Sequence, residues 1–143
     1  MKISTKGRYG LRIMTDIAIH EKEGCVSVKD IAMRENLSEK YLEQIITPLS
    51  KAGLVKSVRG AKGGYLLSKS AKETSVEEIL LATEGSLAPV ACAEDSECCE
   101  NYCDCVTSFI GTKIYDAIIG VVRNISLEEL AERSAKSGGC KSC

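Results

Sequence analysis

The sequence is poor in aromatic residues, in proline and in long apolar runs. Its 143 residues include no Trp, 1 Phe, 1 His and 2 Pro. Apolar runs such as residues 79–82 are far shorter than the roughly 18 residues of a membrane-spanning helix. Residues 1–8 carry charge but lead into no apolar signal core, so we expect a cytoplasmic protein without a membrane partner. The remaining composition, 44% hydrophobic and 27% charged residues, is typical of a mainly α-helical globular protein.

The net charge of −1 conceals an uneven distribution along the chain. Residues 1–74 contain 14 Lys and Arg against 8 Asp and Glu, whereas residues 75–143 contain 5 against 12. A basic first half attracts polyanions, and such a split is a known sign of contact with nucleic acid or a membrane surface. Charge alone does not separate this interpretation from an ordinary solvated surface.

Hydrophobic periodicity and serine capping signals predict six helices and one β-hairpin. The expected helices cover residues 9–19, 27–36, 38–53, 75–82 and 106–122, and a last one starts at Ser126. Pro48 lies inside the third helix and predicts a kink there. Two short strands, at residues 54–58 and 65–68, flank a glycine-rich loop and predict the hairpin.

The order helix, helix, helix, hairpin is that of a winged helix-turn-helix, in which the second helix of the pair enters the major groove. Its polar side chains opposite the core stripe face DNA, where Gln suits an adenine edge and Glu accepts from cytosine. In the wing, Arg59 followed by Gly60 suits a narrow minor groove, and Lys62 suits a phosphate. The candidate DNA-binding residues are Ser38, Glu39, Lys40, Glu43, Gln44, Arg59, Gly60 and Lys62.

Four stretches of the sequence resemble the Rrf2 family of bacterial transcriptional regulators. They are MKISTKGRYGLR at 1–12, SEKYLEQI at 38–45, VRGAKGGYLL at 58–67 and NISL at 124–127. The resemblance covers nearly the whole chain and implies a winged-helix homodimer that binds double-stranded DNA at a palindromic operator. It also implies a DNA contact from Tyr41 and a long dimerisation helix at 106–123. The family includes iron-sulfur cluster regulators and sensors of cysteine supply and nitric oxide.

These features predict three regions. We expect a winged helix-turn-helix domain at residues 1–85 and a cysteine-rich cluster-binding loop at 86–105. Residues 106–143 would then hold the dimerisation helix, a short helix and a flexible tail.

Cysteine is the residue type in excess, with 8 copies. Five of them fall within 14 residues: Cys92, Cys98, Cys99, Cys103 and Cys105. In a reducing compartment such groups bind metal or carry redox chemistry more often than they form disulfides. Thiolates are the usual ligands of iron-sulfur clusters. Four thiolates also suit zinc, but a zinc ribbon has two separated Cys-x-x-Cys pairs, and the only such pair here is Cys140–Cys143.

The resemblance refines the cluster hypothesis. Cluster-sensing members of the family carry three cysteines in this loop and usually bind a 2Fe-2S cluster. Cys92 corresponds to the first and Cys105 to the third, while Cys98 and Cys99 compete for the second. The histidine expected three residues after the third cysteine is Ser108 here, a poor ligand. The fourth ligand is therefore open among Cys103, a group of the first helix and the partner subunit, and a 4Fe-4S cluster is the alternative.

The leading hypothesis is a DNA-binding transcriptional regulator whose operator affinity depends on the bound cluster, as a repressor or an activator. The alternative is a thiol-based redox, nitric oxide or cysteine-supply regulator of the same fold without a stable cluster. A redox enzyme or cluster carrier using Cys140 and Cys143 is a third possibility. We expect no enzyme, because the sequence offers no phosphate loop, substrate pocket or catalytic base. Cys25 resembles a small buried hydrophobe, and the lone His20 a satisfied side chain.

Overall fold

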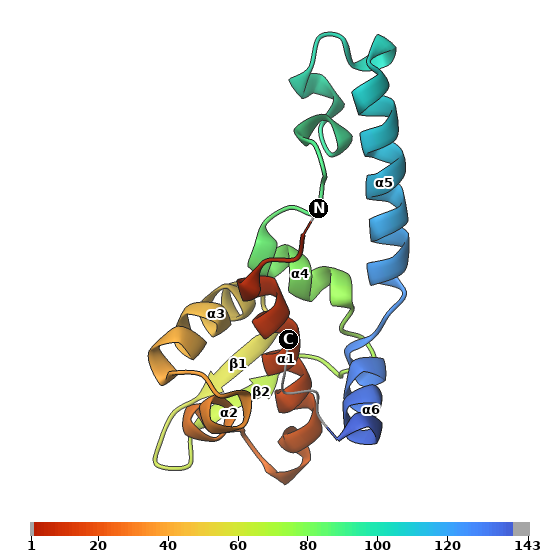
Figure 1. The fold of residues 1–143 in the computed structure, drawn as a ribbon. Coiled ribbons are helices and arrows are strands. Elements are labelled where there is room, and N and C mark those ends of the chain that lie inside the picture. The colour runs from red at the N-terminus through yellow and green to blue at the C-terminus, as the bar shows by residue number, and fades with distance from the viewer. Residues whose placement is uncertain (1, 139–143) are drawn as a thin grey trace.

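The computed structural model describes residues 2–138 and shows a helical body from which one long helix projects (Figure 1). The helices are α1 Thr5–His20, α2 Val28–Glu35, α3 Glu39–Lys51, α4 Val76–Glu84, α5 Val106–Arg123 and α6 Leu127–Ser137. The strands are β1 Val55–Val58 and β2 Gly64–Leu67, and short 3-10 turns lie at Glu21–Glu23, Ala91–Ala93, Ser96–Cys98 and Tyr102–Asp104. The prediction of a mainly α-helical chain with one small hairpin is confirmed. Within residues 2–138 no helix is both long and apolar enough to cross a membrane.

Serine residues start most of the helices. The side-chain oxygens of Ser27, Ser38 and Ser75 each accept a hydrogen bond from the backbone amide three residues later, as predicted. Ser4 does the same for Gly7, so α1 begins at Thr5, four residues before the predicted start. The capping box of α4 is complete, because Glu78 also accepts from the backbone amide of Ser75.

The core forms where α1 meets α3, α4, α6 and β2. Leu42, Ile45 and Leu49 of α3 are fully buried there, as are Ile13 and Ile17 of α1. α3 continues through Pro48 to Lys51. The chain returns to this core after α5, because Leu127 at the start of α6 is fully buried in the same cluster.

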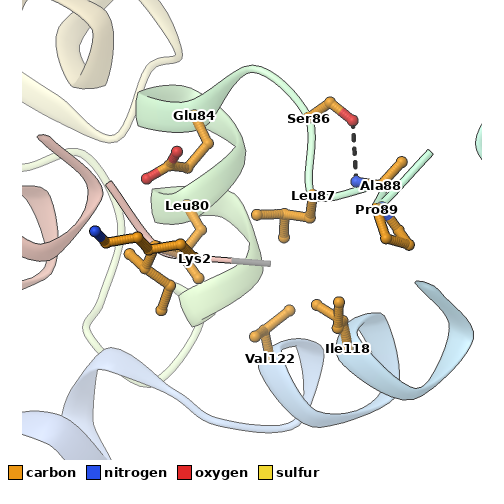
Figure 2. A pocket seen from close by; sticks show the side chains of 10 residues that line it. Lys2, Leu80, Glu84, Ser86, Leu87, Ala88, Pro89, Ile118 and Val122 are labelled. Atoms are coloured by element: carbon orange, nitrogen blue, oxygen red, sulfur yellow. Dashed lines mark hydrogen bonds between the residues drawn. The ribbon is translucent and has the colours of Figure 1, made fainter. Parts of the chain in front are cut away.

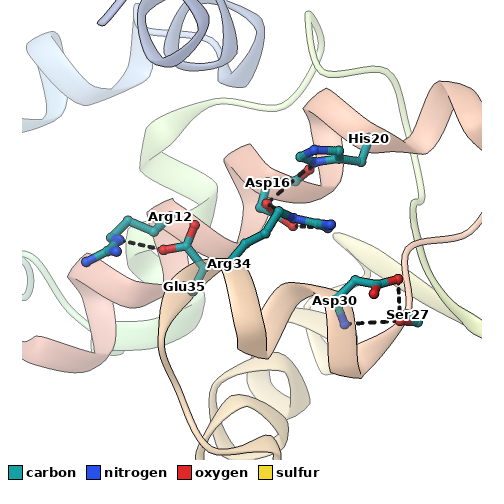
Figure 3. A network of polar contacts seen from close by, with 7 residues as sticks. All are labelled: Arg12, Asp16, His20, Ser27, Asp30, Arg34 and Glu35. Atoms are coloured by element: carbon teal, nitrogen blue, oxygen red, sulfur yellow. Dashed lines mark hydrogen bonds and ion pairs between the residues drawn. The ribbon is translucent and has the colours of Figure 1, made fainter. Parts of the chain in front are cut away.

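Two ion pairs join α2 to α1 (Figure 3). The guanidinium of Arg34 donates through Nε and Nη2 to the two carboxylate oxygens of Asp16, at 2.7 and 2.8 Å. This hydrogen bonding raises the pKa of Arg34. Arg12 Nε donates to Glu35 at 2.6 Å. Because the Asp16 side chain is only 6% exposed, the pairing fixes the first helix of the helix-turn-helix against α1.

A third segment supports the hairpin. β1 and β2 pair antiparallel from Val55↔Leu67 to Val58↔Gly64. Val26 forms a bridge to Tyr65 through two backbone hydrogen bonds of 2.8 and 2.9 Å. The loop between the strands turns at Gly60, whose φ of 120° is a conformation that glycine adopts without strain. The wing is thus held to the chain segment that precedes α2.

Helix α5 makes few contacts with the body. Among its residues only Ser108 and Gly111 are buried, while Val106, Phe109 and Val121 are 82%, 65% and 60% exposed. Figure 1 shows α5 beside α4 at one end and beside the loop that precedes it at the other. A long helix with an exposed apolar surface is typical of a segment that packs against a partner.

Candidate functional site

Helix α3 presents a polar face to solvent. Ser38, Glu39, Lys40, Glu43 and Gln44, all predicted to face DNA, are exposed. The exposed stripe continues beyond them to Thr47 and Lys51, one face of the helix away from its buried residues. Tyr41 is half-buried and packs edge-to-face on Tyr9, with ring centroids 6.0 Å apart.

The wing lies beside this helix. Arg59, Gly60 and Lys62 are exposed in the loop between β1 and β2. Burial and then the negative charge of Glu43 raise the pKa of the Tyr65 phenol. Glu43 belongs to α3 and Tyr65 to β2, so the carboxylate of α3 lies near enough to β2 to act on its phenol.

Several cationic side chains near this surface have no carboxylate partner, as is also true of lysines elsewhere among the described residues, such as Lys22, Lys72 and Lys113. The arginines Arg12, Arg34, Arg123 and Arg133 and the lysine Lys69 each lie within 4.0 Å of a carboxylate. In the part of the chain that the structure describes, Lys6, Lys40, Lys51, Arg59 and Lys62 form no such ion pair. Unneutralised cations on one side of a molecule attract the phosphates of a nucleic acid.

The five clustered cysteines occupy the irregular segment at the start of α5. Cys92, Cys99 and Cys105 are half-buried, whereas Cys98 and Cys103 are exposed, and all five are free thiols. Between residues 2 and 138 no group of three or more His, Cys, Asp or Glu is arranged to hold a metal ion. The chemistry of the donors fits an iron-sulfur cluster, although the thiols are not already arranged as a set of metal ligands in this part of the chain.

Ser108 stands where the family resemblance expects a histidine ligand. Its side chain is buried, and its hydroxyl hydrogen-bonds to the carbonyl oxygens of Tyr102 at 2.5 Å and Cys105 at 2.7 Å. The hydroxyl therefore fixes the turn before α5 to the first turn of that helix. Such a group is engaged in backbone structure and does not replace the histidine.

The thiols of the loop differ in acidity. Backbone amides of Ser108 and Thr107 at the first turn of α5 hydrogen-bond to the Cys105 sulfur and lower its pKa. Desolvation and the negative charge of Asp95 raise the pKa of Cys98. Of the two, Cys105 is the better provider of a thiolate.

Cys25 and His20, outside the cysteine loop, form hydrogen bonds within the body. Cys25 is half-buried, and its thiol donates to the Lys62 carbonyl in the wing at 2.7 Å, so it is not the small buried hydrophobe that the sequence indicated. His20 Nδ1 lies 2.8 Å from the backbone oxygen of Asp16. Cys140 and Cys143 lie outside the described residues.

A cavity of about 390 Å³ lies between α4, α5, residues 86–89 and the N-terminal segment (Figure 2). Leu87, Ile118 and Val122 line one side of it, and Glu84 and Lys2 the other. Between the same two helices, the Arg123 guanidinium at the end of α5 pairs with Glu77 of α4 at 2.8 Å. The junction between α5 and the body therefore combines incomplete packing with one bidentate ion pair.

These features define a winged-helix DNA-binding protein. The Rrf2 family, described as iron-dependent transcriptional regulators, matches residues 3–133. The chain belongs to this family, as its sequence motifs predicted, and is a transcriptional regulator by family rather than an enzyme.

Relatives with two different names are similar to the chain. The regulator CymR of Bacillus subtilis is 45% identical over 92% of this chain and 90% of its own length. The regulator IscR of Photorhabdus laumondii is 42% identical over 91% of this chain and 79% of its own length.

Solved structures of a CymR and of an IscR are similar to the fold of this chain. The structure of B. subtilis CymR, described as its global cysteine regulator, has a TM-score of 0.75 and 44% identity over 93% of this chain and 98% of CymR. The structure of T. potens IscR has a TM-score of 0.76 and 39% identity over 99% of this chain and 94% of IscR. The winged-helix fold class is thereby confirmed.

Proposed function

We propose that the protein is a homodimeric regulator that reads a palindromic operator with two copies of α3 and the wing. The exposed polar face of α3 supplies the major-groove contacts, and Arg59 supplies a minor-groove contact. The exposed apolar residues of α5 support its role as the dimer contact, because burying them against a second copy removes apolar surface from water. Two-fold symmetry of the protein then matches two-fold symmetry of the operator.

We further propose that this regulator responds to an iron-sulfur cluster held by the cysteine loop, with 2Fe-2S favoured over 4Fe-4S. The observation that carries the proposal is the concentration of five free thiols in residues 92–105. Cys92, Cys105 and one of Cys98 and Cys99 supply three thiolates. Cys103 is the favoured fourth ligand, because it is exposed two residues from Cys105 and the Ser108 hydroxyl is already engaged.

A rearrangement of the loop on binding a cluster would reach the DNA-binding surface through α5. The loop packs on α5 at Gly111, where a side chain would overlap Val90. At its other end α5 is tied to α4 by the Glu77–Arg123 pair. A ligand that binds one arrangement of these elements more tightly than the other can change operator affinity by at most the difference between its two binding free energies.

The test begins with protein purified without oxygen. We expect visible charge-transfer absorption, with iron and acid-labile sulfide in roughly equal amounts. Cys92→Ser and Cys105→Ser should lose this absorption, and Cys25→Ser, the matched control outside the loop, should keep it. Colourless protein that stays colourless after anaerobic reconstitution, yet binds DNA, contradicts the cluster and leaves the family function intact.

A second candidate is a thiol-responsive regulator without a stable cluster, in line with the cysteine regulation named for CymR. The hydrogen bond from the Cys25 thiol to the Lys62 carbonyl favours it, since a modified sulfur no longer donates to the wing. Oxidation by a peroxide, which converts the thiol to a sulfenic acid while the peroxide is reduced, should then weaken DNA binding. Cys25→Ser should remove this response, whereas Cys92→Ser should keep it.

A further inference from the structure

A basic groove lies next to the predicted DNA-reading residues. Its volume is about 500 Å³, and its lining residues are Lys6 of α1 and Gln44, Thr47, Pro48 and Lys51 of α3. Gln44 and Lys51 belong to the exposed stripe of α3, so the groove continues the recognition surface toward the C-terminal end of that helix. Lys6 brings a cation from a different helix to the same place.

The groove is lined by hydrogen-bond donors and by no carboxylate. None of its lining residues is acidic. Lys6 and Lys51 are exposed and pair with no carboxylate within residues 2–138. The Gln44 amide adds a neutral donor. The Thr47 hydroxyl is already used, because it donates to the Glu43 carbonyl at 2.7 Å. Two ammonium groups and one amide, with no anion between them, are a donor set for a phosphodiester.

The position of Lys6 is fixed by the body. It lies in the first turn of α1, directly after the Ser4 cap. Ser4 is held by Glu84 at the end of α4, whose Oε1 accepts from the Ser4 amide at 3.0 Å and from the Ser4 hydroxyl at 2.7 Å. A cation on an anchored helix start loses less conformational freedom on binding than one on a mobile arm.

We propose that Lys6 and Lys51 together hold one DNA-backbone phosphate in this groove, with Gln44 as a supporting donor. The proposal rests on the DNA-reading surface of α3 and the wing and adds a sequence-independent contact to it. Lys6 and Lys51 then set how α3 is seated in the major groove without selecting a base.

The experiment measures the affinity of the full-length protein for a fluorescein-labelled 30-base-pair duplex of one fixed random sequence, by anisotropy, from 50 to 300 mM KCl. The test variant is Lys6→Gln/Lys51→Gln. The matched control, Arg133→Gln/Lys136→Gln, removes two exposed positive charges from α6. A Lys6→Arg/Lys51→Arg variant keeps the charges, and thermal unfolding by circular dichroism confirms that each variant folds.

We expect the slope of log K against log[KCl] to become shallower by about 0.9 for each phosphate that is no longer bound, about 1.8 for two subunits. Affinity at 100 mM KCl should fall about tenfold or more, while the control and the arginine variant should retain the wild-type slope. If the test and control variants have the same slope while the wild-type protein binds the duplex, the phosphate contact is refuted alone. If the wild-type protein does not bind the duplex even at 50 mM KCl, the DNA-reading surface is refuted as well.

Discussion

Replacing Gly7 with alanine should destabilise the protein, although alanine is the better helix former. Gly7 lies buried in the first turn of α1, and a Cβ there would overlap Glu84 Oε1 and lie 3.0 Å from Ile3 Cγ2. The Glu84 carboxylate must therefore move. It holds both the amide and the hydroxyl of Ser4, so its displacement breaks two hydrogen bonds at the start of α1.

The two effects have opposite signs and different sizes. Alanine in place of glycine in a helix contributes about 1 kcal/mol of stability. Two hydrogen bonds to a charged group contribute about 1.5 kcal/mol each, or about 3 kcal/mol together. Gly7→Ala should therefore lower the free energy of unfolding by about 2 kcal/mol, which for a chain of this length lowers Tm by about 7 °C.

A double-mutant cycle isolates the cause. Urea and thermal unfolding at pH 7, followed by far-ultraviolet circular dichroism, would compare the wild type, Gly7→Ala, Glu84→Ala and the double variant. Gly7→Ala should be destabilising in the wild-type background and neutral or stabilising when Glu84 is absent. An equal cost in both backgrounds, or a gain in the wild type, would refute the assigned role of the carboxylate.

Three further substitutions test other contacts. Arg123 holds the pKa of Glu77 below its usual range. The pair therefore stabilises the fold fully above about pH 4.3, and this stabilisation is lost as pH falls through the folded-state pKa of Glu77. The wild type and Glu77→Gln should differ in Tm at pH 7 more than at pH 3. Ser108→Ala leaves two carbonyls without their hydroxyl donor and should cost about 1–2 kcal/mol, visible as faster amide hydrogen exchange at the start of α5 but not in α1. Asp16→Asn deprives Arg34 of its bidentate partner and should lower the free energy of unfolding in urea by about 2–3 kcal/mol; no measurable change would show that the pair is as weak as an exposed one.

Helix caps and apolar periodicity, which are patterns among residues close in sequence, predicted the helices and the hairpin well. The serine caps at Ser38 and Ser75 are where the sequence placed them, and the apolar stripe from Val106 located α5. Caps and helical periodicity depend on residues three or four positions apart, so one sequence contains the whole signal. The exposed polar residues of α3 and the wing followed from the same local patterns.

Contacts between distant residues were not predictable in this way. Ser4 and Glu84 are 80 positions apart, and nothing in the local pattern joins them. The docking of Leu127 into the main core and the contact of Cys25 with the wing likewise depend on the tertiary arrangement. The cysteine loop has no helical or strand periodicity, so the sequence identified its thiols as donors without placing them around a centre.

The two connections of α5 to the body differ greatly in length. After α5 the chain re-enters the body within three residues, where Ser126 bridges Ser75 and the Val76 amide donates to the Ile125 carbonyl at 2.9 Å. Before α5 it travels from Gly85 to Cys105 through irregular turns. The helix is about 27 Å long, with its short connection to the body at residues 124–126 and the cysteine loop at its opposite end. A shift of about 2 Å at one end of such a helix corresponds to a tilt of about 4°, so under the proposed function a chemical change among the cysteines would alter the angle between α5 and the body.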